Sequence, residues 1–203
     1  MTGTTITTAS GFILDLANPG RDAIWITDMA AGLGHVCRFA GQGKAFYSVA
    51  EHSCLGAEHL GRLGGTPLDQ LQFLLHDAHE AYTGDLSTPL KHVLGEGIGR
   101  VQARLQVAIL EALGVPPPDA ETASLIRQAD AVLAATEYAA LFDHAPPWNG
   151  PGVPSPHIRL SFWPPTWAPL RWLAAYDRLR AAAQTGIGSP QALRHSGTQV
   201  LKP

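Results

Sequence analysis

The chain has 203 residues, of which 45% are hydrophobic and 15% are charged, and its formal net charge is −3. This length and apolar content predict one folded domain rather than a disordered chain. The slight negative charge lacks the basic excess with which proteins bind nucleic-acid polymers or anionic membranes. We therefore expect neither a nucleic-acid polymer nor a membrane among the partners.

The N-terminal segment gives no sign of a targeting signal. Residues 1–11 lack a basic start and an apolar core. No apolar run in the chain approaches about 18 residues, the length that a membrane span requires. These features predict a cytoplasmic protein. The two cysteines, Cys37 and Cys54, are too few for a cysteine-rich zinc cluster and are expected to be free, buried thiols.

The N-terminal part of the chain predicts a hairpin and a first helix. Short β-like runs at residues 5–8 and 12–16 flank a Ser-Gly turn dipeptide, a pattern typical of a hairpin. Residues 27–28 offer a helix N-cap, and apolar residues follow at helical spacing. The glycines of residues 41–43 are expected to end this helix.

Two capping patterns mark the next helices. Ser48 and Glu51 match the S-x-x-E capping box, which predicts a helix that begins just after Ser48. Thr66 followed by Pro67 is a second helix start, because proline suits the first helical position. The helix that it opens is expected to continue to Gly84.

The C-terminal half predicts further helices and two non-helical segments. The expected elements are a short turn or helix opened by Pro89, a helix over residues 98–113 closed by Gly114, a helix capped by Asp119 or Thr122 that runs towards Phe142, a surface loop at 145–157, and a helix capped by Thr166. The sum is an all-α domain over residues 1–184 with a minor N-terminal hairpin. A mobile tail is expected at residues 185–203.

The chemistry concentrates at His76 and Asp77, in the helix expected to end at Gly84. Adjacent helical residues point about 100° apart, so both side chains can reach one divalent ion only from the edge of a helical face. Further ligands must come from elsewhere. His52, in the first turn of the preceding helix, is one candidate, and Asp130 is the other, because a carboxylate among apolar neighbours needs a cation or hydrogen-bond donors. Two histidines with two carboxylates favour Mn, Fe, Co, Ni or Zn over Mg or Ca and leave positions open for water and substrate.

Glu80 lies four residues after His76, on the same face of the expected helix but one turn away. That position suits a group that handles the proton of a metal-bound water rather than a ligand. His79 points off this face, so we expect it at the surface or beside a ligand. The remaining histidines are expected to have ordinary structural or surface roles.

Four segments, taken together and in this order, resemble the HD-domain phosphohydrolases. They are residues 37–39 (CRF), 49–53 (VAEHS), 76–91 (HDAHEAYTGDLSTPLK) and 127–130 (RQAD). The branches that look most similar are the bacterial 5′-deoxynucleotidases and the phage-type deoxynucleoside triphosphohydrolases. The likeness covers roughly residues 5–180.

The resemblance implies an α-helical domain that hydrolyses a phosphate ester of a nucleotide. It implies one catalytic divalent ion, held by His52, His76, Asp77 and Asp130. It also implies a homodimer or a larger homo-oligomer.

By matched position, the resemblance implies roles for several further residues. Glu80 would be the general acid/base, and Arg38 would hold the phosphate on the 5′ carbon. Lys91 and Arg127 match basic positions that contact phosphates, and Asp85 would help to hold the sugar or a metal-bound water. These residue types suit the roles, because arginine offers a planar fork to phosphate oxygens and lysine a mobile point charge.

Phe39 stands where the deoxynucleotidase branch has a tryptophan, packed where a ribose 2′-hydroxyl would lie. The smaller ring leaves room for a 2′ substituent. This departure from the family pattern argues against a strict preference for 2′-deoxy sugars, so we expect a substrate whose sugar is 2′-deoxy or 2′-modified.

Removal of the 5′-phosphate from a nucleoside monophosphate is the function expected first. A triphosphohydrolase is the nearest alternative, with Lys91 and Arg127 holding the outer phosphates. Hydrolysis of a cyclic or alarmone nucleotide would be favoured by a second metal cluster, which the sequence does not suggest. A nucleotide-binding sensor without turnover belongs to a different class, and the intact Glu80 argues against it. A plain structural module leaves residues 76–91 unexplained.

Overall fold

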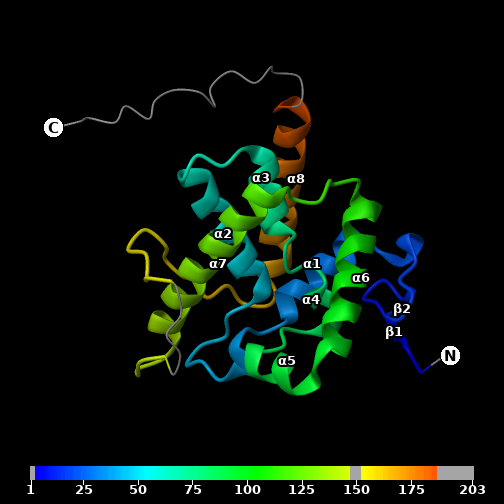
Figure 1. The fold of residues 1–203 in the computed structure, drawn as a ribbon, viewed down its shortest axis with the longest axis horizontal. Helices are drawn as coiled ribbons and strands as arrows, with labels where there is room; N and C mark the ends of the chain where they lie inside the picture. Colours follow the sequence, from blue (N-terminus) through cyan, green and yellow to red (C-terminus); the bar gives the residue numbers. More distant parts are fainter. Residues whose placement is uncertain (1–2, 147–151, 187–203) are drawn as a thin grey trace.

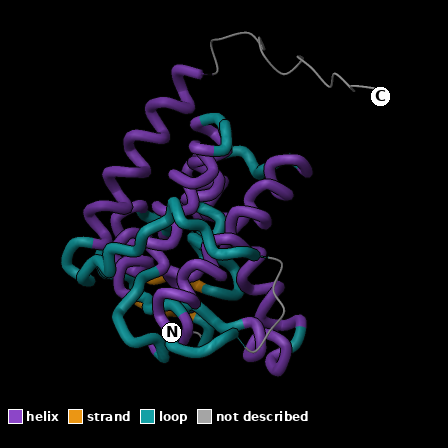
Figure 2. The backbone as a smooth tube through the Cα atoms, turned by 90° about the vertical axis from the view of Figure 1, so that its left-hand side faces the viewer, coloured by secondary structure: helices purple, strands orange, loops and turns teal. Residues whose placement is uncertain are grey.

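The computed structural model describes residues 3–146 and 152–186. These residues form a helical fold with one small antiparallel sheet, so the predicted all-α class with a minor N-terminal hairpin is confirmed (Figure 1). Figure 2 shows that helices make up nearly all of the regular structure. The elements are β1 (Thr5–Thr7), β2 (Ile13–Asp15), α1 (Ile26–His35), α2 (Val49–Arg62), α3 (Pro67–Leu74), α4 (Glu80–Thr83), α5 (Thr88–Leu94), α6 (Glu96–Leu113), α7 (Ala120–Leu141) and α8 (Ala168–Gly186), with 3-10 turns at Arg21–Ala23 and Phe39–Gly41.

The hairpin packs onto α1 through a buried carboxylate. Strands β1 and β2 pair with Ile6 opposite Leu14, and Leu14 is fully buried. Asp28 accepts hydrogen bonds from the backbone N–H and the hydroxyl of Ser10, in the hairpin turn. The prediction that residues 27–28 cap α1 is therefore wrong. The helix begins at Ile26, and Asp28 bonds to the hairpin rather than to its own helix.

The core lies among α1, α2, α3 and α8, and α8 packs against the other three. Trp172 of α8 and Phe73 of α3 are fully buried within it. Helices α2 and α3 approach closely at Gly56, where a Cβ atom would overlap the ring of Phe73. Glycine therefore lets these two helices meet, and the close contact brings the start of α2 near the end of α3. None of the described helices combines the length and apolar character that crossing a bilayer requires.

The helix expected to run from Pro67 to Gly84 is interrupted. It ends at Leu74 and resumes as the short α4. The carbonyl of Phe73 would bond to the backbone N–H of Asp77 in a continuous helix. Instead it accepts from both the backbone N–H and the Nδ1 atom of His76. His76 and Asp77 therefore lie in a turn, and the prediction that they share a helix with Glu80 is wrong.

The predicted helix starts are mostly confirmed. Thr66 and Asp69 form a complete capping box at α3, and Asp119 is the residue that caps α7. Gly114 ends α6 in the left-handed conformation, with φ of 59°. Helix α8 begins at Ala168, two residues beyond the predicted cap Thr166.

The capping box at α2 is only half formed. The Ser48 side chain accepts from the backbone N–H of Glu51. The Glu51 carboxylate turns away and accepts backbone N–H groups of Ser161, Phe162 and Trp163 instead. Three donors satisfy a buried carboxylate better than the single N–H of the box, so Glu51 ties the segment before α8 to the core.

Parts of two predicted segments lie outside the described residues. These parts are residues 147–151 of the expected loop and residues 187–203 of the expected tail, while residues 185 and 186 belong to α8. Both cysteines are free thiols, as predicted, but the prediction that both are buried is wrong for Cys37. Cys54 is buried and Cys37 is half-buried.

Candidate metal centre

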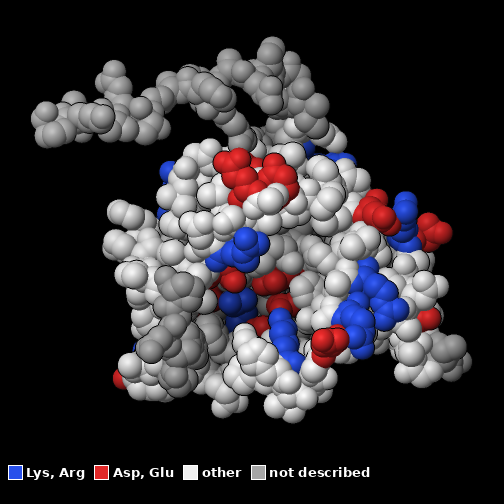
Figure 3. Space-filling view, in the orientation of Figure 1, with Lys and Arg blue, Asp and Glu red and all other residues white. Residues whose placement is uncertain are grey.

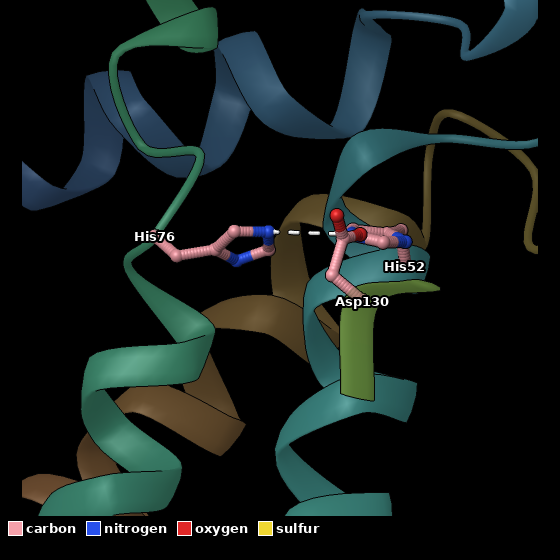
Figure 4. Close-up of side chains that lie close together, drawn as sticks. All are labelled: His52, His76 and Asp130. Atoms are coloured by element: carbon pink, nitrogen blue, oxygen red, sulfur yellow. Dashed lines mark ion pairs between the residues drawn. The ribbon is translucent and has the colours of Figure 1, made fainter. Parts of the chain in front are cut away.

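Three donor side chains from separate segments meet between α2, α3 and α7. His52 lies in the first turn of α2, His76 in the turn after α3, and Asp130 in the middle of α7. Their ligand atoms all lie within 4.8 Å of one another. Asp130 Oδ1 is 3.3 Å from His52 Nε2 and 4.0 Å from His76 Nε2. In Figure 4, His76 reaches the group from one side and the other two residues from the opposite side. Such a group can hold one metal ion.

Asp77 brings a second carboxylate to the same place. Its Oδ2 atom lies 3.1 Å from His76 Nε2 and 3.8 Å from His52 Nε2. The structure therefore gathers all four side chains that the sequence singled out as ligands. It does so through a turn, which lets two consecutive side chains point to one place more easily than a helix with about 100° between neighbours.

The Nδ1 atom of each of the two histidines already has a hydrogen-bond partner. His52 Nδ1 lies 2.6 Å from Glu137 Oε1, and His76 Nδ1 lies 2.7 Å from the carbonyl oxygen of Phe73. A carboxylate and a carbonyl only accept, so in the neutral rings each Nδ1 carries the proton and each Nε2 keeps its lone pair. Both Nε2 atoms are buried without a hydrogen-bond partner. Two such nitrogens beside two carboxylates fit a divalent transition metal.

The centre attracts positive charge. Burial lowers the pKa of His76, but the carboxylates of Asp77 and Asp130 outweigh burial and raise it to about 9. Burial raises the pKa of Asp130, but His52 and His76 outweigh burial and lower it to about 2. The carboxylates therefore favour a cation among them, whether a proton on the imidazole or a divalent ion.

Arg38 lies beside the donor group on the side of α7. Its Nε atom donates to Glu137 Oε2 at 3.1 Å, and its Nη1 atom lies 3.8 Å from Asp77 Oδ2. Burial lowers the pKa of Arg38, but Glu137, Asp85 and the nearby aspartates outweigh burial and raise it. Arg38 therefore stays a cation with its terminal nitrogens close to the metal ligands.

Glu80 lies beside Asp77 on another side of the centre. Donor atoms of Asp77, His79 and Glu80 lie within 4.8 Å of one another. Glu80 is 2% exposed, and its Oε2 atom has no hydrogen-bond partner. Lys91 Nζ lies 3.8 Å from Glu80 Oε1. Burial and the charge of Asp77 raise the pKa of Glu80 well above its ordinary value, so the carboxyl group can retain a proton near neutral pH.

Asp85 supports the backbone beside Arg38. Its Oδ2 atom accepts from the backbone N–H of Phe39 at 3.2 Å. Phe39 and Ala40 have φ of 55° and 52°, a left-handed conformation that non-glycine residues rarely adopt. Such strain is typical of functional segments that the surrounding structure holds in place. Asp85 therefore helps to fix the turn that presents Arg38.

Charged side chains surround the centre unevenly. Figure 3 shows a hollow between α5, α6 and α7 with acidic and basic side chains inside it and further basic side chains at its rim. Lys91 lies next to the centre, because its Nζ atom contacts the Glu80 carboxylate. Arg127 is exposed one turn before Asp130, and it forms no ion pair with any carboxylate of residues 3–146 and 152–186. The structure thus brings Lys91, but not Arg127, into contact with the centre.

Glu137 is the residue of this site that sequence reasoning missed. It is fully buried and contacts Tyr47, His52 and Arg38. One signal could have revealed it, because Glu137 follows Asp130 by seven residues and so lies two turns along the same face of α7.

Comparison with known proteins places the chain among bacterial relatives. No family model matches the chain. It is 36% identical to the uncharacterized protein YfdR of Escherichia coli (strain K12) over 134 residues, which are 65% of this chain and 69% of YfdR. It is 41% identical to the uncharacterized protein RCAP_rcc00048 of Rhodobacter capsulatus over 133 residues, which are 63% of this chain and 68% of that protein. The chain therefore belongs to the family that includes YfdR and RCAP_rcc00048.

Proposed function

We propose that this protein is a metal-dependent phosphohydrolase of the HD-domain type, which removes the 5′-phosphate from a nucleoside monophosphate. One observation supports this above all. Two buried imidazole Nε2 atoms without partners face two carboxylates, with Arg38 on one side and Glu80 on another. Metal donors, a cation that binds phosphate and a buried acid are the components that hydrolysis of a phosphate ester requires.

His52, His76, Asp77 and Asp130 would hold one divalent ion. The mixed nitrogen and oxygen donors favour Mn, Fe, Co, Ni or Zn. Such an ion supplies Lewis acidity and lowers the pKa of bound water from about 15.7 to about 7.

Arg38 binds the phosphate in this proposal. Its Nε atom is engaged by Glu137, so the two terminal nitrogens remain for the phosphoryl oxygens. These nitrogens form a planar fork that matches two oxygens of a phosphate, and they stabilise the charge that develops there as the ester is cleaved. The distance of 3.8 Å between Nη1 and Asp77 Oδ2 puts that fork next to the metal ligands.

Glu80 carries the proton. A carboxyl group protonated near neutral pH can donate to the 5′ oxygen as the phosphorus–oxygen bond breaks. The attacking water loses one proton in the same reaction, and that proton restores Glu80. In this proposal Lys91, whose Nζ lies 3.8 Å from Glu80 Oε1, holds Glu80 in place and contacts a further phosphate oxygen.

The substrate is a nucleotide whose sugar is 2′-deoxy or 2′-modified. Phe39 follows Arg38 directly, and its ring packs edge-on against Tyr138 and Phe142. The sugar attached to a phosphate on Arg38 would lie near this ring. In this proposal Asp85, which accepts from the Phe39 backbone N–H, also contacts the sugar or a water.

The test is a panel of nucleoside mono-, di- and triphosphates with ribo, deoxy and 2′-substituted sugars, assayed with Mn, Co, Ni and Mg. We expect phosphate and a nucleoside from monophosphates. Release of triphosphate would favour the triphosphohydrolase, and nucleotide binding without turnover would favour a sensor. The panel is accompanied by light scattering, which tests the expected homodimer.

Two matched variants give the panel its control. His76→Ala should abolish turnover. His157→Ala should not, because it removes an exposed imidazole beside Arg62, at the end of α2 opposite to His52. Wild-type rates of phosphate release by purified His76→Ala protein would show that the proposal is wrong.

A further inference from the structure

Glu137 makes contacts that join two parts of the candidate site. Its Oε1 atom accepts from the Tyr47 hydroxyl at 2.8 Å and lies 2.6 Å from His52 Nδ1. Its Oε2 atom accepts from Arg38 Nε at 3.1 Å. The side chain is fully buried, so no solvent competes for these bonds. One carboxylate therefore contacts a candidate metal ligand and the candidate phosphate-binding residue at the same time.

The bond to His52 sets the direction of that ligand. The carboxylate accepts a proton-bearing nitrogen, which keeps Nδ1 as the donor and leaves Nε2 facing Asp130 and Asp77. His76 is oriented in the same way by the backbone carbonyl of Phe73. No side-chain substitution can remove that hydrogen-bond acceptor. The orientation of His52 therefore depends on the Glu137 side chain, which a substitution can change.

The bond to Arg38 restrains a competitor of the ion. Arg38 Nη1 already lies 3.8 Å from Asp77 Oδ2. A guanidinium released from Glu137 can rotate and form a closer ion pair with Asp77, which occupies an oxygen that the ion needs. The hydrogen bond from Arg38 Nε to Glu137 therefore holds the guanidinium in place. Its terminal nitrogens point towards the centre, but Nη1 stays 3.8 Å from Asp77 Oδ2 instead of forming a close ion pair.

We propose that Glu137 is a positioning residue that couples metal binding to phosphate binding, by fixing His52 as an Nε2 ligand and holding Arg38 off Asp77. The inference rests on the proposed metal site and the proposed phosphate role of Arg38. It adds that one substitution, at a residue that is neither a metal ligand nor a phosphate-binding residue, weakens metal binding and phosphate binding together. Removing partners that orient a ligand typically costs 10- to 100-fold in metal affinity or activity.

Glu137→Gln is the first variant. The amide keeps the size of the side chain but has only one accepting oxygen, so it cannot accept from both His52 and Arg38 through separate oxygens. We expect the affinity for Zn²⁺, measured by calorimetry on the whole chain, to fall about 10- to 100-fold. We also expect weaker binding of inorganic phosphate to the zinc-loaded protein. In the zinc-loaded wild type, NMR should show a proton on His52 Nδ1 in a strong hydrogen bond, and its resonance should shift in the variant.

Two further variants separate positioning from general damage. Glu51→Gln removes another buried carboxylate, which accepts the backbone N–H groups of Ser161, Phe162 and Trp163 in the segment before α8. It should lower thermal stability while leaving the zinc and phosphate affinities unchanged. Glu137→Asp keeps the charge but shortens the reach, so it should weaken both affinities in part. It decides the question if Glu137→Gln does not fold.

The outcomes are separable from those of the proposed function. If the wild type binds Zn²⁺ and phosphate but cleaves no nucleotide, the proposed activity fails while Glu137 can still be shown to position the site. The inference is overturned if folded Glu137→Gln protein binds Zn²⁺ and phosphate with wild-type affinity. If Glu137→Gln does not fold, wild-type affinities of folded Glu137→Asp protein overturn it in the same way. Loss of only one of the two affinities contradicts the coupling.

Discussion

His52 Nδ1 lies 2.6 Å from Glu137 Oε1, although 85 residues separate the two in the chain. Glu137 lies two turns after Asp130 on α7. One helix therefore supplies both the candidate ligand Asp130 and the residue that orients the candidate ligand His52. The spacing of helical turns makes this possible, because residues seven apart lie on one face. Helix α7 is therefore the element on which the arrangement of the centre depends most.

Metal should stabilise the protein without being required for its fold. The buried apolar cluster runs from Leu14 to Ala183 and contains none of the four candidate ligands. We expect the protein treated with a chelator to remain folded, and added Zn²⁺ or Mn²⁺ at 100 times its Kd to add about 2.7 kcal/mol of stability. Thermal unfolding measured with and without metal checks this. His157→Ala should keep the shift and His76→Ala should lose it; an equal shift in both would contradict the site.

Substitution of Gly56 should damage the site through packing. Gly56→Ala puts a methyl group into the ring of Phe73, whose carbonyl holds His76. Overpacking of this kind costs about 1–3 kcal/mol, and it pushes α2 and α3 apart. We expect a lower free energy of unfolding in urea together with weaker zinc binding. Gly20→Ala meets no atom within 4 Å and serves as the neutral control. Equal stability of the two variants would contradict the close contact.

Arg38→Lys should weaken substrate binding while preserving charge. Lysine lacks the planar fork and cannot reach Glu137 and a phosphate at once. Loss of a charged hydrogen bond of about 1.5–3 kcal/mol corresponds to a fall in kcat/KM of about 10- to 150-fold. We expect KM to rise because Arg38 binds the phosphate, and kcat to fall because Arg38 stabilises the charge that develops as the ester is cleaved. Steady-state kinetics on a nucleoside monophosphate provide the measurement. Arg159→Lys, at an exposed position, should have no effect. An unchanged kcat/KM in Arg38→Lys would remove Arg38 from the phosphate site.

The pH profile should report Glu80. Burial, Asp77 and Asp85 raise its pKa, and Arg38 and Lys91 only partly oppose them. The active, protonated acid therefore predominates below this raised pKa, and activity should fall as the pH rises through it. Glu80→Gln should lower kcat strongly, keep zinc affinity, and remove this alkaline limb. If the limb persists in the residual activity of Glu80→Gln, another group is responsible.

The two thiols should differ in reactivity. Burial raises the pKa of Cys54, so its thiol stays protonated and inaccessible in the folded protein. A disulfide reagent should modify Cys37 in the native state and both thiols in guanidinium. Cys37→Ser should leave the native protein without a rapidly reacting thiol. Rapid native reaction of that variant would show that Cys54 is not buried in solution.

Much of the fold follows from patterns within a few residues. The complete capping box of Thr66 and Asp69, the Asp119 cap and the glycine end of α6 were predictable, because each bond joins groups three or four positions apart. The hairpin was predictable because its strands pair across a short turn, with partners no more than 10 positions apart. The four candidate ligands, which the structure brings together, could be singled out for another reason. Histidines and aspartates at special positions are rare enough to stand out, and their order resembles a known family.

The tertiary structure decided which partner each buried polar group has. Asp28 bonds to the hairpin instead of capping its helix, and Glu51 holds a segment 110 or more residues away. His76 interrupts its helix by taking the Phe73 carbonyl. A buried polar atom must find some partner, and the partner with the best geometry is often distant in the chain. The composition and local patterns of the sequence determine which groups are buried, whereas only the packed chain determines what they bind.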